Sequence, residues 1–408
     1  MRDRICSVSF FIVTFAKKRI MSFPKVILKQ GKEKSILRRH PWVFSGAVYG
    51  VSQEIADGEM VEVVDAKNQL LGTGYFSDKG GIVVRLLTFG SEKFTNDFWT
   101  QKLISAWNLR TQLLNLEVTN AFRVIHGEGD GIPGLIIDFY NNHWVLQAHS
   151  SGIYYQIEKI AQTIQSAFPT YCETIYCKSS GTLPNTGTDY FLYGNTKETI
   201  AKENHILFSV NWVEGQKTGF FLDQRDNRKL LAEFSKGKKV LNTFCYTGGF
   251  SIYAMKSGAE LVTSVDISQK AVDLAAKNME LNFSNANHQP VADDVFNFMK
   301  ENHQIYDLIV LDPPAFAKSI KSKHTATQAY KRLNIAGLKA LAPKGILFTF
   351  SCSQVIDDVL FYNTIAAAAI ESGRIIRVLH KLGQGPDHPT NIYHPEGHYL
   401  KGLVLYVE

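Results

Sequence analysis

Two residues with catalytic potential, Cys352 and Asp312, each follow an apolar, β-prone run. Cys352 comes directly after GILFTFS, and Asp312 comes directly after YDLIVL. If these runs are parallel strands of one sheet, both side chains emerge at its carboxyl edge, where open α/β sheets bind ligands. There a thiolate can act as a nucleophile, provided that polar neighbours lower its pKa, and a carboxyl group can share a proton. A lone strand-end cysteine is more often an inert core residue, so the neighbours decide.

A glycine turn and a series of acids indicate a ligand site around these residues. In NTFCYTGGFS, Gly248 and Gly249 separate a strand from a helix, without the GxGxxG pattern of nicotinamide sites. Any one acid at a strand end could simply cap a helix. After the strand that leads into the glycine turn, three successive strands deliver acids at one edge, which favours a ligand with ribose and adenine but no phosphates. The acids that end these strands are Asp266, Asp293, Asp294 and Asp312.

The elements that must position these residues fall into three parts of the 408-residue chain. From residue 196 onward, apolar runs alternate with helical patterns, which predicts βαβ units and a parallel sheet with helices on both faces. Residues 22–95 alternate between short strands and turns, as in MVEVVDAKNQLLGTGYFS, which predicts a small β-rich domain. Residues 96–195 contain both helical and strand patterns and are expected to form a small central α/β domain. The fold class is therefore α/β, in three domains.

Composition excludes several classes of protein. Hydrophobic residues make up 45% and charged residues 20%, and no apolar run approaches the length of a membrane span. Five cysteines form no metal-like pairs, and His388, His394 and His398 have no compact ligand spacing, so we expect no metal and a reduced, cytoplasmic protein. The basic, apolar start is too short to cross a membrane. We expect translation to begin at Met21 and treat residues 1–21 as an upstream extension.

The motifs also resemble a known family. FCYTGGF, SVDIS, DDVF and LDPPAF are similar to the ordered motifs of class I S-adenosylmethionine-dependent methyltransferases. KEKSILRRHPWVFSGAV, GEGDGIPGLIIDFY, KTGFFLDQRDNR and HPEGHYLKG further resemble bacterial large-subunit ribosomal RNA cytosine-C5 methyltransferases of the RlmI type. The likeness extends from Met21 over nearly the whole chain. It implies an N-terminal PUA domain, a central α/β domain and a C-terminal Rossmann-like methyltransferase domain.

The resemblance assigns roles to individual residues. Cys352 would be the nucleophile that adds to C6 of cytosine in 23S ribosomal RNA, while Asp312 would hold the base edge and offer a proton at N3. The segment around KTGFFLDQRDNR would close over the cofactor and approach the target base. The residues expected to bind S-adenosylmethionine are Phe221, Asp223, Gln224, Arg225, Asn242, Phe244, Tyr246, Thr247, Gly248, Gly249, Asp266, Ile267, Asp293, Asp294 and Asp312.

Two basic clusters suggest how RNA would be bound, although each could equally be solvated surface. The first interleaves cations with aromatic residues, and the second follows DPPAF. Trp42 could stack on a base or belong to the core of the β-rich domain, and for Phe44 the core is the preferred interpretation. The expected RNA-binding residues are Lys32, Lys34, Arg38, Arg39, Trp42, Lys318, Lys321 and Lys323.

Three alternatives stay open at this stage. An N-methyltransferase could use DPPAF, with Phe316 stacking on the base, and would not need Cys352. A catalytically silent RNA-binding protein could retain the fold as a scaffold. The motif after Asp312 also lacks the second cysteine of many RNA cytosine-C5 methyltransferases, which leaves the group that removes the C5 proton open. The expected partner is 23S ribosomal RNA, naked or in early assembly, with no membrane and with a homodimer left open.

Overall fold

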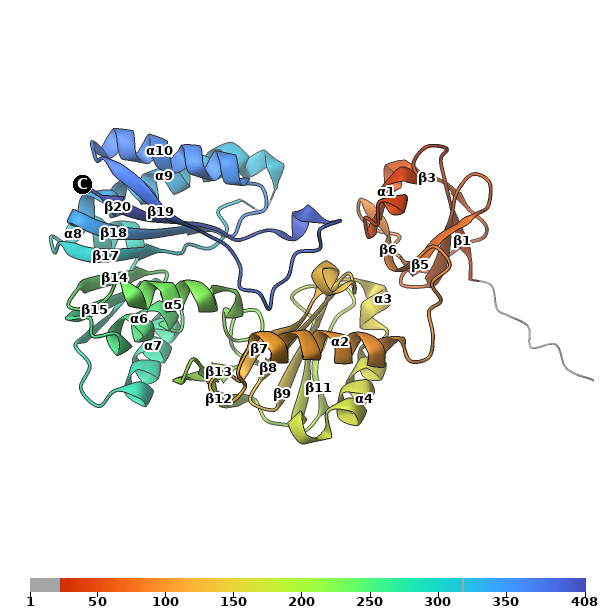
Figure 1. Ribbon diagram of the computed structural model, residues 1–408, viewed down its shortest axis with the longest axis horizontal. Helices are drawn as coiled ribbons and strands as arrows, with labels where there is room; N and C mark the ends of the chain where they lie inside the picture. Colours follow the sequence, from red (N-terminus) through yellow and green to blue (C-terminus); the bar gives the residue numbers. More distant parts are fainter. Residues whose placement is uncertain (1–22, 318) are drawn as a thin grey trace, which may run out of the picture.

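The structure is a computed structural model that describes residues 23–317 and 319–408, in which three units follow one another along the chain (Figure 1). The expected upstream extension and Lys318 lie outside the described residues. The N-terminal unit is a six-stranded sheet of order β2-β6-β5-β4-β1-β3, with one short helix, α1 (Lys34–Leu37). A turn at Lys67–Asn68 joins β4 to β5, and Asn68 has a φ of 63°. The strands are β1 (Lys25–Leu28), β2 (Trp42–Phe44), β3 (Val48–Val51), β4 (Met60–Val64), β5 (Leu70–Phe76) and β6 (Ile82–Phe89).

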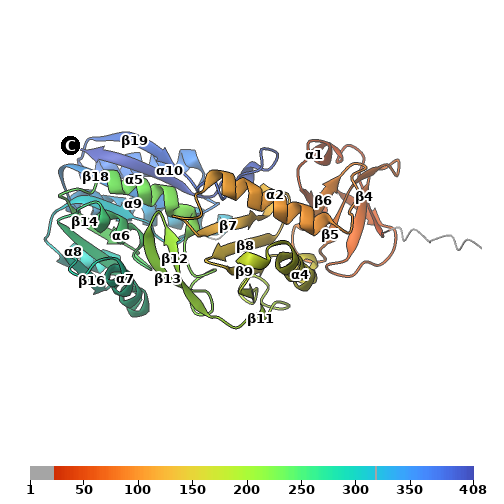
Figure 2. The ribbon, with the colours of Figure 1, turned by 60° about the horizontal axis from the view of Figure 1, so that its bottom comes forward.

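The central unit is a five-stranded sheet of order β11-β10-β9-β8-β7. Helices α2 (Phe98–Leu113) and α4 (Ile157–Ala167) contact each other and bury apolar side chains against the sheet (Figure 2). Asn141 and Asn142 both have positive φ, which suits the two-residue turn between β8 and β9. The strands are β7 (Ala121–His126), β8 (Leu135–Tyr140), β9 (His143–Ala148), β10 (Thr174–Lys178) and β11 (Asp189–Tyr193).

A two-stranded hairpin, β12 (Glu198–Glu203) and β13 (Ile206–Asn211), leads into the C-terminal unit. That unit is a seven-stranded sheet of order β16-β15-β14-β17-β18-β20-β19. Its first five strands are parallel as predicted, but β20 runs antiparallel to both neighbours. The strands are β14 (Lys239–Thr243), β15 (Leu261–Asp266), β16 (His288–Ala292), β17 (Tyr306–Leu311), β18 (Leu341–Ser351), β19 (Ile376–Leu382) and β20 (Lys401–Val407).

Helices cover both faces of this sheet. On β17, Ile309 and Leu311 pack into one apolar cluster, while Leu308 and Val310 pack into another, because strand side chains alternate between faces. The first cluster lies under α8 (Val295–Glu301), α9 (Lys323–Ala340) and α10 (Asp358–Ser372). The second lies under α5 (Arg225–Glu233) and α6 (Gly249–Lys256), with α7 (Gln269–Asn282) beside α6. No helix among the described residues is long and apolar enough to cross a membrane.

Buried ion pairs join the units around Asp387, which is fully buried. Its carboxylate accepts two hydrogen bonds from the guanidinium of Arg225, at 3.0 and 2.8 Å, and one from the backbone N–H of Arg123. Its carbonyl accepts a hydrogen bond from Arg110, whose guanidinium also pairs with Asp130. These contacts fix the central unit against the chain that surrounds the carboxyl edge of the large sheet.

Candidate active site

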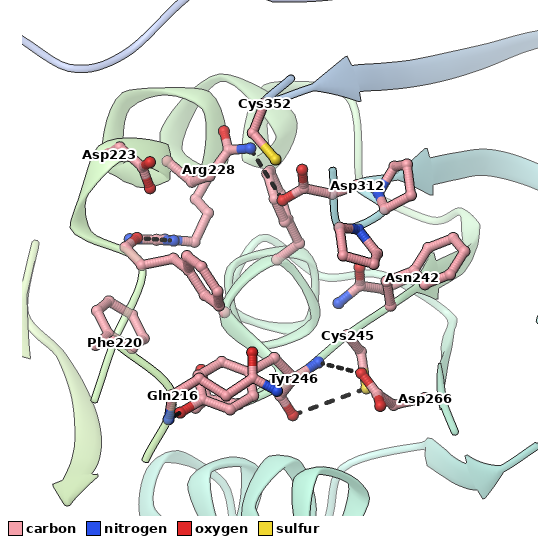
Figure 3. Close-up of a pocket in the computed structure, with 18 of the residues that line it drawn as sticks. Gln216, Phe220, Asp223, Arg228, Asn242, Cys245, Tyr246, Asp266, Asp312 and Cys352 are labelled. Atoms are coloured by element: carbon pink, nitrogen blue, oxygen red, sulfur yellow. Dashed lines mark hydrogen bonds between the residues drawn. The ribbon is translucent and has the colours of Figure 1, made fainter. Parts of the chain in front are cut away.

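A cavity of about 220 Å³ lies at the carboxyl edge of the large sheet (Figure 3). Residues that follow β14, β15, β17 and β18 form part of its wall, as expected for an open α/β sheet. The segment that precedes α5 forms most of the remaining wall, to which Arg228 of α5 and Leu400 also contribute. Of the residues predicted from the sequence, those that line the cavity are Phe221, Asp223, Gln224, Asn242, Phe244, Tyr246, Thr247, Gly249, Asp266, Ile267, Asp312 and Cys352.

The turn between β14 and α6 forms the floor of the cavity. Gly248 has a φ of 76°, and a Cβ there would lie 2.9 Å from the side chain of Ala275, so only glycine fits. This turn directs the backbone N–H of Tyr246 to Oδ2 of Asp266, at 3.0 Å, while Ser268 donates to Oδ1, also at 3.0 Å. The carboxylate of Asp266 is thereby fixed beside the glycine turn, with lone pairs left for ligand hydroxyl groups.

Two observations fit S-adenosylmethionine to this cavity. Ile267, next to Asp266, is 75% exposed and gives the cavity wall an apolar surface suited to a flat base. At the other side, Oδ1 of Asp223 is buried and has no hydrogen-bond partner among the described residues. Its second oxygen accepts a 2.6 Å hydrogen bond from Tyr399. A buried carboxylate oxygen requires a donor, and the amino group of the methionine moiety is one.

Cys352 and Asp312 project into the same cavity from neighbouring strands β18 and β17 (Figure 3). The Asp312 carboxyl group is oriented by Gln224, whose side-chain Nε2 donates a hydrogen bond of 2.9 Å to Oδ2. Cys352 is half-buried and packs beside the apolar cluster under α5 and α6. A thiol, a carboxyl group and the cofactor cavity therefore lie at one rim of the sheet.

The two groups hold their protons more tightly than usual. Burial raises the pKa of Asp312 to about 7, and the negative charge of Asp223 adds to the effect. Burial also raises the pKa of Cys352, with a further contribution from Asp312. The lowered thiol pKa expected from the sequence is therefore wrong for the protein without ligands, because the strand end is enclosed and faces a carboxyl group. The thiol must lose its proton during the reaction.

The pKa of Asp223 moves in the opposite direction. Burial alone would raise the pKa of Asp223. The positive charges of Lys217 and His388 and the hydrogen bond from Tyr399 outweigh burial, so the pKa is lowered. The cavity thus contains one carboxyl group that is ionised and one that is partly protonated near neutral pH.

Four predicted cofactor residues do not line the cavity. Arg225 points away from it because its guanidinium is used by Asp387. The carboxylate of Asp294 accepts from the N–H groups of Phe296 and Asn297 and so caps α8. Gly248 shapes the turn without reaching the surface of the cavity. Asp293 is half-buried beside Asp266, to whose carbonyl its backbone N–H donates.

Sequence reasoning missed two cations in the wall. Lys217 lies 4.8 Å from the centre of the Phe221 ring, and its φ of 48° is unusual for a side chain of this size. Arg228 pairs with the buried carboxylate of Glu203 and donates to the carbonyl of Phe221, at 2.9 Å. Both lie in the family-like motif KTGFFLDQRDNR, so that motif was the available signal.

The predicted RNA-binding residues differ in their exposure to solvent. Lys32, Lys34, Arg38 and Arg39 are exposed around α1, and Lys321 is exposed before α9, whereas half-buried Lys323 pairs with Asp357. Lys318 lies outside the described residues.

The two aromatic residues of the first cluster behave differently from what was expected. Phe44 is 47% exposed, so its preferred assignment to the core is wrong, because the short strand β2 turns that side chain outward. Trp42 is half-buried, donates from Nε1 to Glu128 of the central unit at 2.8 Å, and packs on His394. It is a contact between units rather than a free stacking platform.

The three histidines near the end of the chain lie in different surroundings. His388 approaches Asp387, His398 approaches Asp358, and His394 lies near His40 and Glu396. Nδ1 of His40 lies within hydrogen-bond distance of the backbone N–H and carbonyl of Trp42, and its Nε2 lies 3.6 Å from Glu396.

Comparisons with known proteins agree with this site. A model of the S-adenosylmethionine-dependent methyltransferase family matches residues 182–392, and a PUA-like domain model matches residues 26–89. Ribosomal RNA large subunit methyltransferase I of Aeromonas hydrophila is 39% identical over 393 residues, which cover 93% of this chain and 98% of the relative. A methyltransferase structure from Streptococcus mutans has a TM-score of 0.81 at 26% identity, covering 94% of this chain and 99% of its own. Another structure, of a methyltransferase complexed with SAH, has a TM-score of 0.80 at the same identity and coverage.

The fold, the cavity and these matches define a class I S-adenosylmethionine-dependent methyltransferase, and S-adenosylmethionine is its methyl donor. Within that class, the chain belongs to the ribosomal RNA large subunit methyltransferase I family. The expected fold class, family and cofactor are confirmed.

Proposed function

We propose that this protein methylates C5 of a cytosine in 23S ribosomal RNA through a covalent bond between Cys352 and C6 of the base. The observation that carries the proposal is that the Cys352 thiol and the Asp312 carboxyl group face the cavity that fits the methyl donor. The relatives' name supplies the class of RNA. Residues 22–95, 96–195 and 196–408 would be the RNA-binding, central and methyltransferase domains.

The chemistry explains why both groups are needed. C5 of cytosine is too weak a nucleophile to take a methyl group unaided. When the Cys352 sulfur bonds to C6, the electrons of the C5–C6 double bond move toward N3, which accepts a proton from Asp312. The C4–C5 bond of the adduct then behaves as an enamine. Bound S-adenosylmethionine supplies the methyl group. Loss of the C5 proton and release of the sulfur from C6 complete the reaction.

The first proton transfer, from the Cys352 thiol, can go directly to the Asp312 carboxylate. The raised pKa of Asp312, about 7, makes its carboxylate a base that can take the thiol proton and its carboxyl form an acid that can pass it to N3. Loss of the negative charge on Asp312 also removes one of the causes that raise the thiol pKa. Gln224 holds Asp312 in place for both steps.

The RNA would reach this cavity along the junction between the three units. A cavity lined by Trp42 lies between the N-terminal unit and the rest of the chain. It shares Ile136, His149 and Tyr399 with another cavity, which in turn adjoins the cofactor cavity. Exposed cations around α1 could contact phosphates at the outer end of this path. The target cytosine must be unstacked to enter, at a cost of a few kcal/mol.

The alternative of N-methylation receives less support. Its stacking residue would be Phe316, but that ring packs on Tyr330, at 4.7 Å between ring centres, and does not line the cavity. A silent RNA-binding protein would have no reason to retain Asp266 and the glycine turn in a cofactor-binding arrangement.

Product analysis tests the proposal. Purified protein, S-adenosylmethionine and 23S ribosomal RNA transcribed in vitro should give 5-methylcytidine by nucleoside mass spectrometry, at one position mapped by bisulfite sequencing. Cys352→Ser should abolish the product. Cys172→Ser is the matched control, because Cys172 belongs to the core of the central unit and does not line the cavity, and it should retain activity. Methyl transfer by Cys352→Ser at the rate of the unaltered protein would refute the mechanism.

A further inference from the structure

A second cavity, of about 470 Å³, lies between the central sheet and the methyltransferase domain. Helices α2 and α4 cover the opposite face of that sheet. On this face the cavity lies beside an apolar cluster in which Val145 and Tyr176 pack with Trp212 and Phe220. All five strands of the central sheet reach its wall. The residues that they contribute are Arg123, Ile136, Gln147, His149, Lys178 and Asp189.

Four of these residues form a row across the sheet. Ile136 pairs with Gln147, and Lys178 pairs with Asp189. Gln147 is next to Lys178, because the preceding pair in the parallel register is Leu146 with Cys177. The row therefore presents one apolar and three polar side chains in a line, as on a β-sheet surface that binds nucleotides.

The charged members of the row are already occupied. Lys178 donates from Nζ to the carbonyls of Trp212, Val213 and Gly215, and so anchors the loop that precedes Lys217. Asp189 accepts hydrogen bonds from the N–H and hydroxyl groups of Ser180. These contacts build part of the cavity wall, in which the Gln147 amide is one of several polar groups, together with His149 and Thr182.

Gln147 is 9% exposed and lines the cavity, and its amide makes no hydrogen bond to a described residue. A carboxamide offers a donor and an acceptor side by side, which is the complement of a nucleobase edge. An apolar ligand or an isolated phosphate would not satisfy both groups. The cavity is thus suited to a base.

The second cavity is adjacent to the catalytic one. The two share Lys217, Phe220, Phe221 and Asp223 as a common wall, whereas Cys352 and Asp312 line only the catalytic cavity. When the target cytosine reaches Cys352, the adjacent nucleotide of the RNA would lie at this common wall. Single-stranded RNA can place successive unstacked bases in separate pockets.

We propose that the second cavity binds the base next to the target cytosine and that Gln147 recognises its edge. The inference rests on the proposed function, because it takes RNA as the substrate. It makes Gln147 a specificity-determining residue: sequence preference beside the target depends on its amide.

The test uses the full-length protein and 23S transcripts with each of the four bases on either side of the mapped target cytosine. The unaltered protein should prefer one base at one of these positions by about tenfold in kcat/KM. Gln147→Leu keeps the size of the side chain and should reduce this preference to less than twofold. Gln162→Leu, on the exposed face of α4, is the control and should keep it. Gln147→Leu with the full preference would overturn the inference.

A second measurement does not depend on the variant. Transcripts containing 4-thiouridine beside the target should photo-crosslink to the unaltered protein within residues 147–149 or 178–189, as mapped by mass spectrometry of the peptides. Crosslinks that fall only outside these segments would overturn the inference even if Gln147→Leu failed to fold. Failure of the proposed function has a different signature, since the unaltered protein would then make no 5-methylcytidine.

Discussion

The carboxyl groups of Asp312 and Asp223 lie in the wall of one cavity, and their pKa values are displaced in opposite directions. Burial and the charge of Asp223 raise the pKa of Asp312 to about 7, whereas Lys217, His388 and a hydrogen bond from Tyr399 keep Asp223 ionised despite its burial. Two carboxyl groups held at different protonation can perform different tasks. Asp312 is suited to moving a proton, and Asp223 to holding a cation.

The rate should depend on pH through Asp312. The reaction requires that the Cys352 thiol is protonated while the Asp312 carboxyl group is ionised. Below the pKa of Asp312 both groups carry a proton, and above it only the thiol does. We expect kcat/KM to rise tenfold per pH unit up to about pH 7 and then level off, because the thiol pKa is raised. In Asp312→Asn the rise should disappear and the rate should fall by about 10²- to 10⁴-fold. An unchanged profile in Asp312→Asn would show that another group titrates.

The same substitution should stabilise the fold at high pH. A carboxyl group whose pKa is raised on folding binds its proton more tightly in the native state, so its ionisation destabilises that state as pH rises from about 4 to above 7. We expect Asp312→Asn to raise the free energy of unfolding by roughly 1–3 kcal/mol at pH 8 and by almost nothing below pH 4. Urea denaturation at both values measures this. Equal effects of Asp312→Asn at the two pH values would contradict the account.

Asp266 and Asp294 should differ sharply, although both acids end strands in the sequence. Asp266→Ala removes a carboxylate from the cavity and should weaken S-adenosylmethionine binding by at least tenfold in calorimetry. Asp294→Ala removes the cap of α8 and should lower stability by about 1 kcal/mol while leaving the affinity within twofold. Equal losses of affinity would place Asp294 in the site after all.

Arg225 should prove to be a structural residue. Arg225→Ala leaves the carboxylate of Asp387 buried without its cation, which costs about 3–5 kcal/mol in comparable cases. We therefore expect a large shift of the urea midpoint. At low temperature, where the variant is folded, its affinity for S-adenosylmethionine should be unchanged. Reduced affinity at full stability would reverse this assignment.

Much of the site could be predicted because it depends on local patterns. Apolar runs that end in Asp266, Asp312 and Cys352 indicate strand ends, and parallel strands bring such ends to one edge. The antiparallel direction of β20 could not be predicted this way, because GLVLYV has the same pattern in either direction.

The rest depended on contacts between distant parts of the chain. Gln224 and Arg225 are neighbours in sequence, yet one holds Asp312 and the other holds Asp387 on a different segment. Trp42 follows a basic cluster, but its partners Glu128 and His394 lie far along the chain. The raised pKa of Cys352 likewise reflects enclosure by several elements, which a local sequence pattern does not report.

The central claim is the bond between Cys352 and C6, and trapping it is the most direct test. In 23S transcripts with 5-fluorocytidine, fluorine replaces the C5 hydrogen whose loss would release the enzyme. The protein and S-adenosylmethionine should therefore form a stable complex with this RNA, and peptide mass spectrometry should place the methylated nucleotide on Cys352. A product methylated on the exocyclic amine, with no covalent complex, would contradict the account.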